Sequence, residues 1–304
     1  MKDFLLFSGS SNQPLAAAVA KKLGISLGKV DLTRFADGEI RPWIVEEVRD
    51  KTVLVLQSLS FPMDEHIMEL SLIGDAIRRS APKRLIAVIP YMGYARQDKQ
   101  HRVGEPVSAR VIAKFLEVSK YNEVITIDLH NDAIVGFFQI PVTHLSALET
   151  LGEEIKKVMI ADGVVISPDV GGVKRARNLA YLLDLPMVVM EKKRFLDRHD
   201  TSESFQIIGD VTGKTAIIVD DIISTGGTIA HSATSLKDAG AQGVIVAATH
   251  GVLAGDAVGN LTRAPIDRIL LTDTIVISSE KKIAKLQVVS VAPLLADAIS
   301  QMIG

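Results

Sequence analysis

Short apolar runs rich in β-branched residues and leucine alternate along the chain with segments of helical pattern. Apolar runs of this kind are typical of strands buried on both faces of a parallel sheet. Because strand and helix patterns alternate, we predict an α/β fold with mainly parallel sheets flanked by helices. The predicted strands span residues 52–56, 85–89, 124–127, 164–166, 187–190, 216–219 and 244–248.

Two of these strands begin in similar sequence. Residues 51–56 and 214–219 both read Lys-Thr followed by an apolar run, and each leads into a polar loop, a helix and another strand. Aligning Lys51 with Lys214 gives an offset of 214 − 51 = 163. The match has two readings, a chance recurrence of a common βαβ unit or a pair of similar domains.

The length of 304 residues fits two domains of about 150 residues each. The favoured boundary lies within residues 141–150, where a turn-like Pro141 and a Thr-His-Leu-Ser stretch precede a new amphipathic pattern. We therefore predict domains at residues 1–145 and 146–304.

Composition narrows the classes of partner. With 47% hydrophobic and 23% charged residues the chain can build buried cores, and its net charge of −2 gives no global attraction to nucleic acid or an anionic membrane. Any anion site must therefore be local. The absence of cysteine excludes disulfides and thiolate metal sites, and neither a secretion signal nor a membrane-spanning stretch is apparent. We expect a cytoplasmic protein with neither a nucleic-acid nor a membrane partner.

The segment of residues 220–228 carries the clearest chemistry. It follows the predicted strand 216–219 and leads into a helix. Glycines let several backbone N–H groups and the helix N-terminus converge on one anion, hydroxyls add donors, and the two acids can accept hydrogen bonds from sugar hydroxyls. The alternative is a helix N-cap beside an ordinary loop. The segment predicts a sugar phosphate site formed by Asp220, Asp221, Ser224, Thr225, Gly226, Gly227 and Thr228.

Residues 209–215, Gly-Asp-Val-Thr-Gly-Lys-Thr, imitate a Walker phosphate loop just upstream. They have one residue too few between the glycines, and they precede a strand whereas that motif follows one. We predict an ordinary turn.

Further polar segments lie in loops or at the ends of predicted strands. Each also has a plainer reading as a solvated loop or, for a lone histidine, a structural hydrogen bond. In α/β proteins, however, loops at the carboxyl ends of strands usually bind ligands. These segments span residues 34–39, which contain Phe35, and residues 90–99, 128–130, 167–175 and 191–194.

Taken in order, these segments resemble the ribose-phosphate pyrophosphokinases, the synthases of phosphoribosyl pyrophosphate, over nearly the whole chain. The matching motifs are residues 34–39, 94–98, 128–130 with 136–138, 169–175 and 219–228. The resemblance implies two similar domains of the type I phosphoribosyltransferase fold. It also implies an enzyme that transfers the diphosphoryl group of ATP to ribose 5-phosphate with Mg²⁺ as cofactor. The first domain would bind ATP, and the loop of the second domain would bind the sugar phosphate.

The resemblance also assigns roles to single residues. It implies that residues 220–228 bind ribose 5-phosphate, and that the protein is a homo-oligomer in which a neighbouring subunit supplies part of the ATP site. The remaining implied assignments are adenine binding by Phe35, Asp37 and Glu39, nucleotide contacts by Arg96 and Gln97, metal ligation by His130 and Asp169, and catalysis by Lys192 and Arg194.

Two positions depart from the family pattern. Ser224 stands where many members have Asp, and residues 100–105 lack the basic, serine-containing pattern with which many members bind regulatory phosphate or ADP. Two rival functions stay open. A phosphoribosyltransferase shares the loop at residues 220–228 but has no need of Phe35 or Arg96, and a regulatory relative is expected to lose the metal ligands or the catalytic segment.

Overall fold

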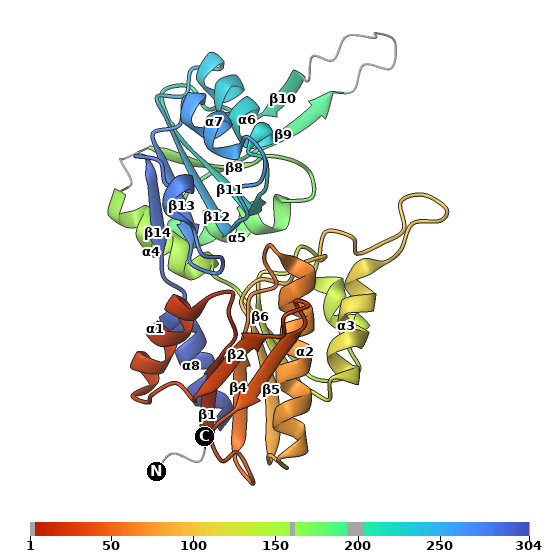
Figure 1. Cartoon of the computed structure of the whole chain (residues 1–304). Helices are drawn as coiled ribbons and strands as arrows, with labels where there is room; N and C mark the ends of the chain where they lie inside the picture. The colour runs from red at the N-terminus through yellow and green to blue at the C-terminus, as the bar shows by residue number, and fades with distance from the viewer. Residues whose placement is uncertain (1–3, 159–161, 194–203, 304) are drawn as a thin grey trace. The chain divides into compact units, whose positions relative to one another are not determined.

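The computed structural model of the chain describes residues 4–158, 162–193 and 204–303 (Figure 1). The chain forms two compact units. Unit 1 comprises residues 1–146, 274–276 and 290–304, and unit 2 comprises residues 147–273 and 277–289.

Unit 1 is built on a five-stranded sheet in the order β1-β4-β5-β6-β7, with every neighbouring pair parallel. The central strands are buried on both faces, as their unbroken apolar sequences require. The strands are β1 (Phe4–Ser8), β4 (Thr52–Leu56), β5 (Arg84–Ile89), β6 (Glu123–Ile127) and β7 (Val142–Leu145).

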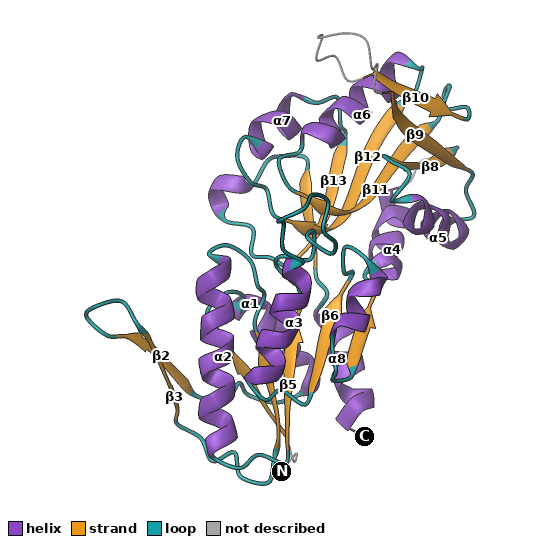
Figure 2. Ribbon diagram, turned by 90° about the vertical axis from the view of Figure 1, so that its right-hand side faces the viewer, coloured by secondary structure: helices purple, strands orange, loops and turns teal. Residues whose placement is uncertain are grey.

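Helices cover both faces of this sheet (Figure 1). On one face α2 (Met63–Arg79) and α3 (Ser108–Val118) share a core with alternate residues of β4. The other face carries α1 (Gln13–Leu23) and α8 (Ala292–Ile303), which pack against each other. A separate antiparallel hairpin, β2 (Val30–Arg34) and β3 (Ile40–Ile44), stands beside α2 (Figure 2), and a short 3₁₀ helix η1 (Asp132–Phe137) precedes β7.

Unit 2 is built on a seven-stranded sheet in the order β10-β9-β8-β11-β12-β13-β14. All pairs are parallel except β10 with β9. The strands are β8 (Gly163–Ser167), β9 (Met187–Lys193), β10 (Ser204–Ile208), β11 (Thr215–Ile223), β12 (Gly243–Gly251), β13 (Arg268–Thr272) and β14 (Leu286–Val289).

Alternation along β11 explains how helices cover both faces of the second sheet. Ile217 and Val219 join the core beneath α4 (Leu148–Val158) and α5 (Val173–Leu183). Ala216 and Ile218 join the opposite core. That core lies beneath α6 (Gly227–Asp238) and α7 (Ala257–Arg263), and a short 3₁₀ helix η2 (Ser279–Lys281) follows β13. The predicted α/β class, with a mainly parallel sheet flanked by helices in each unit, is confirmed.

The two units repeat one order of elements. Unit 1 runs β1-α1-β2-β3-β4-α2-β5-α3-β6-η1-β7, and unit 2 runs β8-α5-β9-β10-β11-α6-β12-α7-β13-η2-β14. In this alignment β4 matches β11 with an offset of 215 − 52 = 163, the offset found in the sequence. The similarity of residues 51–56 and 214–219 therefore reflects two similar domains.

Each repeat is followed by a helix that belongs to the other unit. Helix α4 follows β7 but packs on α5 in unit 2, and α8 follows β14 but packs on α1 in unit 1. The predicted boundary at 145/146 lies beside the passage from unit 1 to unit 2 at Ser146. The division into two contiguous halves differs from the structure at residues 274–276 and 290–304, which group with unit 1.

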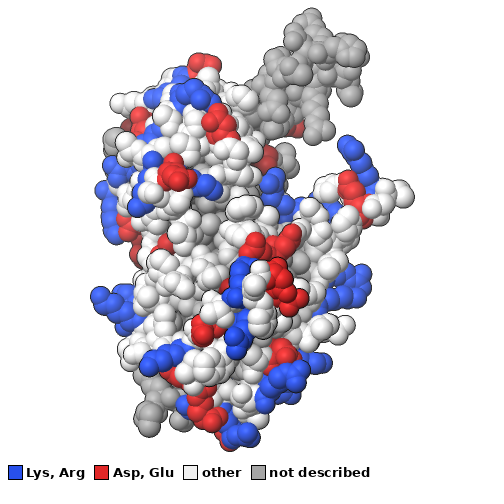
Figure 3. Space-filling view, in the orientation of Figure 1, with Lys and Arg blue, Asp and Glu red and all other residues white. Residues whose placement is uncertain are grey.

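All seven predicted strands are present, and residues 209–214 form the predicted turn before β11, where Lys214 Nζ lies 3.1 Å from Asp210 Oδ2. The sequence pattern did not identify β1, β2, β3, β7, β10, β13 or β14. Acidic and basic side chains are interspersed on the face drawn in Figure 3. Within the described ranges no helix has the length and apolar character needed to cross a membrane.

The helix exchange predicts which unit each terminal helix stabilises. Leu295 of α8 and Leu151 of α4 are both fully packed. Replacing either with Ala should cost about 2–5 kcal/mol through lost burial and a cavity. Native-state hydrogen exchange should show faster exchange in β1 and β4 for Leu295→Ala and in β8 and β11 for Leu151→Ala. Faster hydrogen exchange in unit 2 for Leu295→Ala and in unit 1 for Leu151→Ala would contradict the assignment of α8 to unit 1 and of α4 to unit 2.

Candidate active site

The acids of unit 2 lie at one edge of the sheet because β8 and β11 are parallel neighbours. Ile166 of β8 is in register with Ile218 of β11, so both strands end at the same edge of the sheet. Asp169 follows β8, whereas Asp220 and Asp221 lie within the last four residues of β11. The structure thus brings together two loops that are about 50 residues apart in sequence.

Arg175, in the first turn of α5, joins the acidic pair. Its Nη1 lies 3.4 Å from Asp220 Oδ1 and 3.2 Å from Asp221 Oδ1, and its side chain is mostly buried. The sequence analysis included Arg175 in the loop at residues 167–175 but gave it no role. A cation in the first turn of a helix is disfavoured by the helix dipole, which is a sequence signal for an acidic partner.

Asp220 is the site's perturbed carboxyl group. Burial and the adjacent Asp221 carboxylate raise the pKa of Asp220 well above its usual value, and the Arg175 guanidinium opposes that rise. Asp220 Oδ1 also accepts a hydrogen bond from the Asp221 backbone N–H at 2.8 Å. The arrangement holds two carboxyl groups close together, and as a result Asp220 protonates more readily than an exposed acid.

The loop from Ser224 to Thr228 has the geometry of a phosphate nest. Gly226 has φ +72°, which favours glycine, and a Cβ there would crowd Leu261 Cγ at 3.1 Å. Helix α6 begins at Gly227, and the amides of its first turn have no partners within the helix. The carbonyls of Ser224 and Thr225 are held by the neighbouring segment, through the Ala254 N–H at 2.9 Å and Asn260 Nδ2 at 3.0 Å.

Asp169 is fixed by its own turn. Its Oδ1 accepts from the Gly172 N–H at 2.8 Å, and its carbonyl accepts from Ser167 Oγ at 2.7 Å. A carboxylate has two oxygens with several lone pairs, so this bond leaves acceptor capacity for a cation. Asp169 is exposed, as a metal ligand shared with a substrate requires.

In unit 1, Phe35, Asp37 and Glu39 occupy the turn of the β2–β3 hairpin, and all three are exposed. The Phe35 N–H donates to the Glu39 carbonyl at 2.9 Å, and Asp37 Oδ1 accepts from the Glu39 N–H at 3.2 Å. The Arg41 guanidinium lies 5.5 Å from the centre of the Phe35 ring. The turn is ordered by its own contacts and presents an aromatic face beside acceptors.

Arg96, Gln97 and His130 lie on loops that follow neighbouring strands, β5 and β6. Asn131 Nδ2 donates to Asp98 Oδ2 at 2.7 Å, which joins the two loops. Gln97 is held by Ser108 Oγ and by the Ala109 N–H, which donates to the Gln97 carbonyl at 3.2 Å. The structure therefore gathers these three predicted residues at one sheet edge, with Arg96 and His130 exposed.

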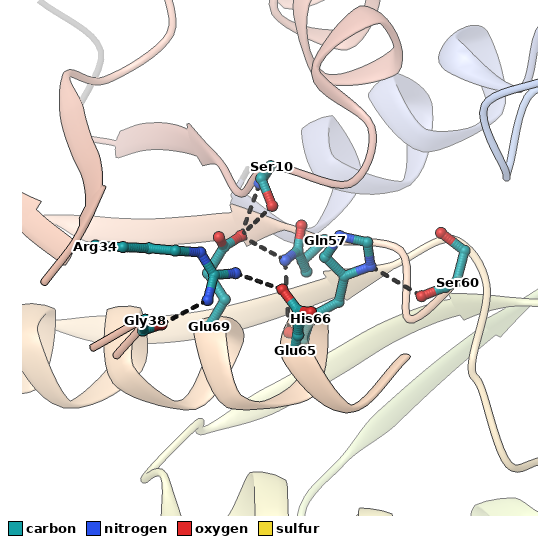
Figure 4. Close-up of polar contacts among 8 residues, drawn as sticks. All are labelled: Ser10, Arg34, Gly38, Gln57, Ser60, Glu65, His66 and Glu69. Atoms are coloured by element: carbon teal, nitrogen blue, oxygen red, sulfur yellow. Dashed lines mark hydrogen bonds and ion pairs between the residues drawn. The ribbon is translucent and has the colours of Figure 1, made fainter. Parts of the chain in front are cut away.

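The first turn of α2 anchors both of these regions of unit 1. Glu65 pairs with Arg34 at the base of the hairpin turn, and Arg34 Nη1 also donates to the Gly38 carbonyl at 2.8 Å (Figure 4). The adjacent Asp64 accepts a hydrogen bond from the Tyr94 hydroxyl of the loop after β5. Two consecutive acids thus position two loops that the sequence assigned to ATP.

Lys192 lies in β9, where its backbone is in register with Phe205 of β10. Its side chain, and Arg194 as a whole, lie outside the described residues. Their assignment stays a prediction.

Comparisons with known proteins agree over nearly the whole chain. Residues 4–119 match the family model for the N-terminal domain of ribose phosphate pyrophosphokinase, and residues 190–303 match that for the phosphoribosyl synthetase-associated domain. Ribose-phosphate pyrophosphokinase 1 of Streptococcus pyogenes is 42% identical over 98% of the chain and 93% of the relative, and that of Streptococcus pneumoniae is 43% identical over the same shares.

A solved structure is similar throughout. The phosphoribosylpyrophosphate synthetase of Mycobacterium smegmatis superposes with a TM-score of 0.93 and 39% identity, covering 98% of each chain. The ribose-phosphate pyrophosphokinase of Bacillus cereus is 44% identical over 97% of this chain and 92% of its own.

Arg175 generates a testable prediction. Arg175→Gln should weaken ribose 5-phosphate binding about tenfold, because the acidic pair loses the guanidinium that contacts both carboxylates. In the unaltered protein the affinity for ribose 5-phosphate should fall with decreasing pH as Asp220 takes a proton. This fall should begin at a higher pH than for an ordinary carboxyl group, because the pKa of Asp220 is raised. The variant should lose affinity at a higher pH, because removing the guanidinium raises the pKa of Asp220 further.

Titration calorimetry across pH measures both effects. Arg177→Gln removes an exposed arginine from the same helix and serves as the matched control. Arg175→Lys should restore part of the affinity, because it returns the charge without the planar fork. Identical pH profiles for Arg175→Gln and the control would contradict the role.

Proposed function

The chain belongs to the ribose-phosphate pyrophosphokinase family, and we propose that it transfers the β,γ-diphosphoryl group of ATP to the 1-hydroxyl of ribose 5-phosphate. The products are 5-phosphoribosyl 1-pyrophosphate and AMP, for nucleotide biosynthesis. One observation carries the sugar side of the proposal: the acidic pair Asp220 and Asp221 leads directly into the glycine-containing start of α6.

The sugar phosphate has complementary chemistry to this segment. Its 5-phosphate matches the first-turn amides of α6 and the hydroxyls of Ser224, Thr225 and Thr228. Its ring hydroxyls match the acceptors of Asp220 and Asp221. Ser224 keeps a hydroxyl where many relatives have Asp, so the phosphate nest is retained and only that carboxylate contact is lost.

The nucleotide belongs to unit 1 in this proposal. Phe35 stacks on adenine, with Asp37 and Glu39 beside it, and Arg96 and Gln97 contact the nucleotide. In a homo-oligomer the hairpin turn serves the site of a neighbouring subunit. Exposed apolar side chains support self-association, because such surfaces commonly mark protein–protein contacts. They are Trp43 and Val45 on or beside β3, and Val111, Phe115 and Val118 along α3.

The chemistry is an in-line displacement. The 1-hydroxyl of ribose 5-phosphate attacks the β-phosphorus, the bond from that phosphorus to the α,β-bridging oxygen breaks, and AMP leaves. No residue of the chain forms a covalent intermediate. The protein contributes by positioning the two substrates and by neutralising the charge that spreads over the phosphate oxygens, with Lys192 and Arg194 stabilising the transition state.

Magnesium fits the available ligands. Within the described ranges no cluster of three or more His, Asp or Glu side chains could hold a metal ion. Mg²⁺ commonly keeps several waters and uses one or two protein ligands together with substrate phosphates. The proposed protein ligands are His130 and Asp169, and Mg²⁺, when bound, would supply positive charge to the phosphate oxygens. The cytoplasmic location expected from the sequence stays a prediction.

The reaction itself is the first test. Purified protein incubated with Mg²⁺, ATP and ribose 5-phosphate should give AMP and phosphoribosyl pyrophosphate in equal amounts, measured by ion-exchange chromatography. Omitting any component should abolish both products. If neither product forms although ribose 5-phosphate binds, the regulatory or phosphoribosyltransferase function replaces this one. Consumption of phosphoribosyl pyrophosphate with a free base would identify the transferase.

The catalytic segment gives a separate prediction. Lys192→Ala and Arg194→Ala should each lower turnover by about 10²–10³-fold while leaving ribose 5-phosphate affinity nearly unchanged, because these groups act on the transition state. Steady-state kinetics and calorimetry measure the two quantities. Lys214→Ala, which removes a lysine bound to Asp210 in the turn before β11, is the control. Unchanged turnover in both variants would exclude this role.

A further inference from the structure

The repeat of the two units extends from strands and helices to single residues. From β4 to α2 and from β11 to α6 the offset of 163 holds without an insertion, so Gln57 corresponds to Asp220 and Glu69 to Ser232. The helix register is supported by burial at four matching positions in each helix. These are His66, Glu69, Leu70 and Ile73 in α2, and Ile229, Ser232, Ala233 and Leu236 in α6.

The first loop of each unit also corresponds. Strands β1 and β8 differ by 163 − 4 = 159, which aligns Ser10 with Asp169. The candidate metal ligand Asp169 and the sugar-binding Asp220 therefore have neutral counterparts in unit 1, Ser10 and Gln57. At the helix position the relation is reversed, because unit 1 has the acid Glu69 where unit 2 has Ser232.

Glu69 is buried, and a single one of its oxygens accepts three hydrogen bonds (Figure 4). Oε1 lies 2.7 Å from the Ser10 backbone N, 2.8 Å from Ser10 Oγ and 2.7 Å from Gln57 Nε2. Two donors thus come from the loop after β1 and one from the end of β4. Convergence of loop amides and side-chain donors on one oxygen is the arrangement that proteins use for an anion.

The donors are themselves positioned for this purpose. Gln57 Oε1 accepts from the Ser11 backbone N–H at 3.0 Å and from Ser11 Oγ at 2.7 Å, which turns the Gln57 amide toward Glu69. Gly9 leaves room for Gln57, because a Cβ at that residue would lie 2.3 Å from Gln57 Oε1. In unit 2 the Ser232 hydroxyl, at the position of Glu69, is buried and has no hydrogen-bond partner in the described part of the chain.

We propose that Glu69 is a built-in anion at the strand ends of unit 1, where unit 2 carries the acids Asp169 and Asp220 instead. Its carboxylate occupies the position that an anionic ligand would take among the donors of Ser10 and Gln57. In this proposal Glu69 closes the strand ends of unit 1 to an anionic ligand, whereas the proposed sugar phosphate site lies in unit 2. The proposal rests on the proposed function only for the identity of the unit 2 ligand.

Chemical rescue tests the proposal. Glu69→Ala removes the acceptor that the Ser10 donors and the buried Gln57 amide share, so its unfolding temperature should fall. Formate, a free carboxylate, should then bind in the vacated position and raise that temperature by roughly 2–4 °C above an equal concentration of chloride. Glu69→Gln keeps the position filled and should show no such difference between the two salts.

Glu65→Ala is the matched control, because it removes an exposed carboxylate from the same helix without exposing these donors. If Glu69→Ala does not fold in chloride, its refolding yield is compared in formate and in chloride, and a higher yield in formate supports the proposal. Equal effects of formate on wild type, Glu69→Gln and Glu69→Ala, or no effect on any, would overturn the proposal. Ribose 5-phosphate binding to Glu69→Ala is read separately, so loss of the sugar site cannot be mistaken for failure of rescue.

Discussion

Parallel pairing of β8 with β11 is the constraint on which the candidate site depends. It ends two buried strands at one edge of the sheet, so that Arg175, which follows β8, contacts Asp220 and Asp221 of β11. Carboxylates so close repel one another, and Arg175 offsets that repulsion from the first turn of α5. The same edge carries the start of α6, whose amides favour a negative charge. Acceptors for hydroxyls and donors for a phosphate are thereby held by rigid elements.

Two copies of one architecture serve different purposes in this chain. Unit 2 carries its acids at the strand ends, Asp169 after β8 and Asp220 and Asp221 within the end of β11, where we propose that a ligand binds. Unit 1 carries neutral donors at the matching loop positions and its acid, Glu69, on the helix. The two units share one backbone arrangement, but their acidic residues lie at different positions in it, so a duplicated fold need not be a duplicated site.

Much of the unit 2 site could be predicted from the sequence, because its residues are consecutive. The apolar run before Asp220 predicted a strand, and the glycines after Thr225 predicted a turn into a helix. The strand continues further than the apolar run, through Ile223, because its register with His250 and Gly251 of β12 supplies hydrogen bonds. That extension is a tertiary effect and has no local signal.

Other features depend on contacts between distant residues and could not be predicted. An amphipathic pattern shows that α8 needs an apolar partner but does not say that the partner is α1 of unit 1. Glu69 looks like any polar residue in α2, because its donors at Ser10 and Gln57 lie 59 and 12 residues away. Arg175 was within a predicted motif, yet its bond to the acidic pair required the register of β8 with β11.

The most direct measurement is a crystal structure of the protein with ribose 5-phosphate and Mg²⁺. The account predicts one sugar phosphate per chain, with its phosphate on the amides at the start of α6 and its hydroxyls on Asp220 and Asp221. Glu69 should remain bonded to Ser10 and Gln57. A sugar phosphate at the ends of β1 and β4, or none at the loop of residues 220–228, would contradict it.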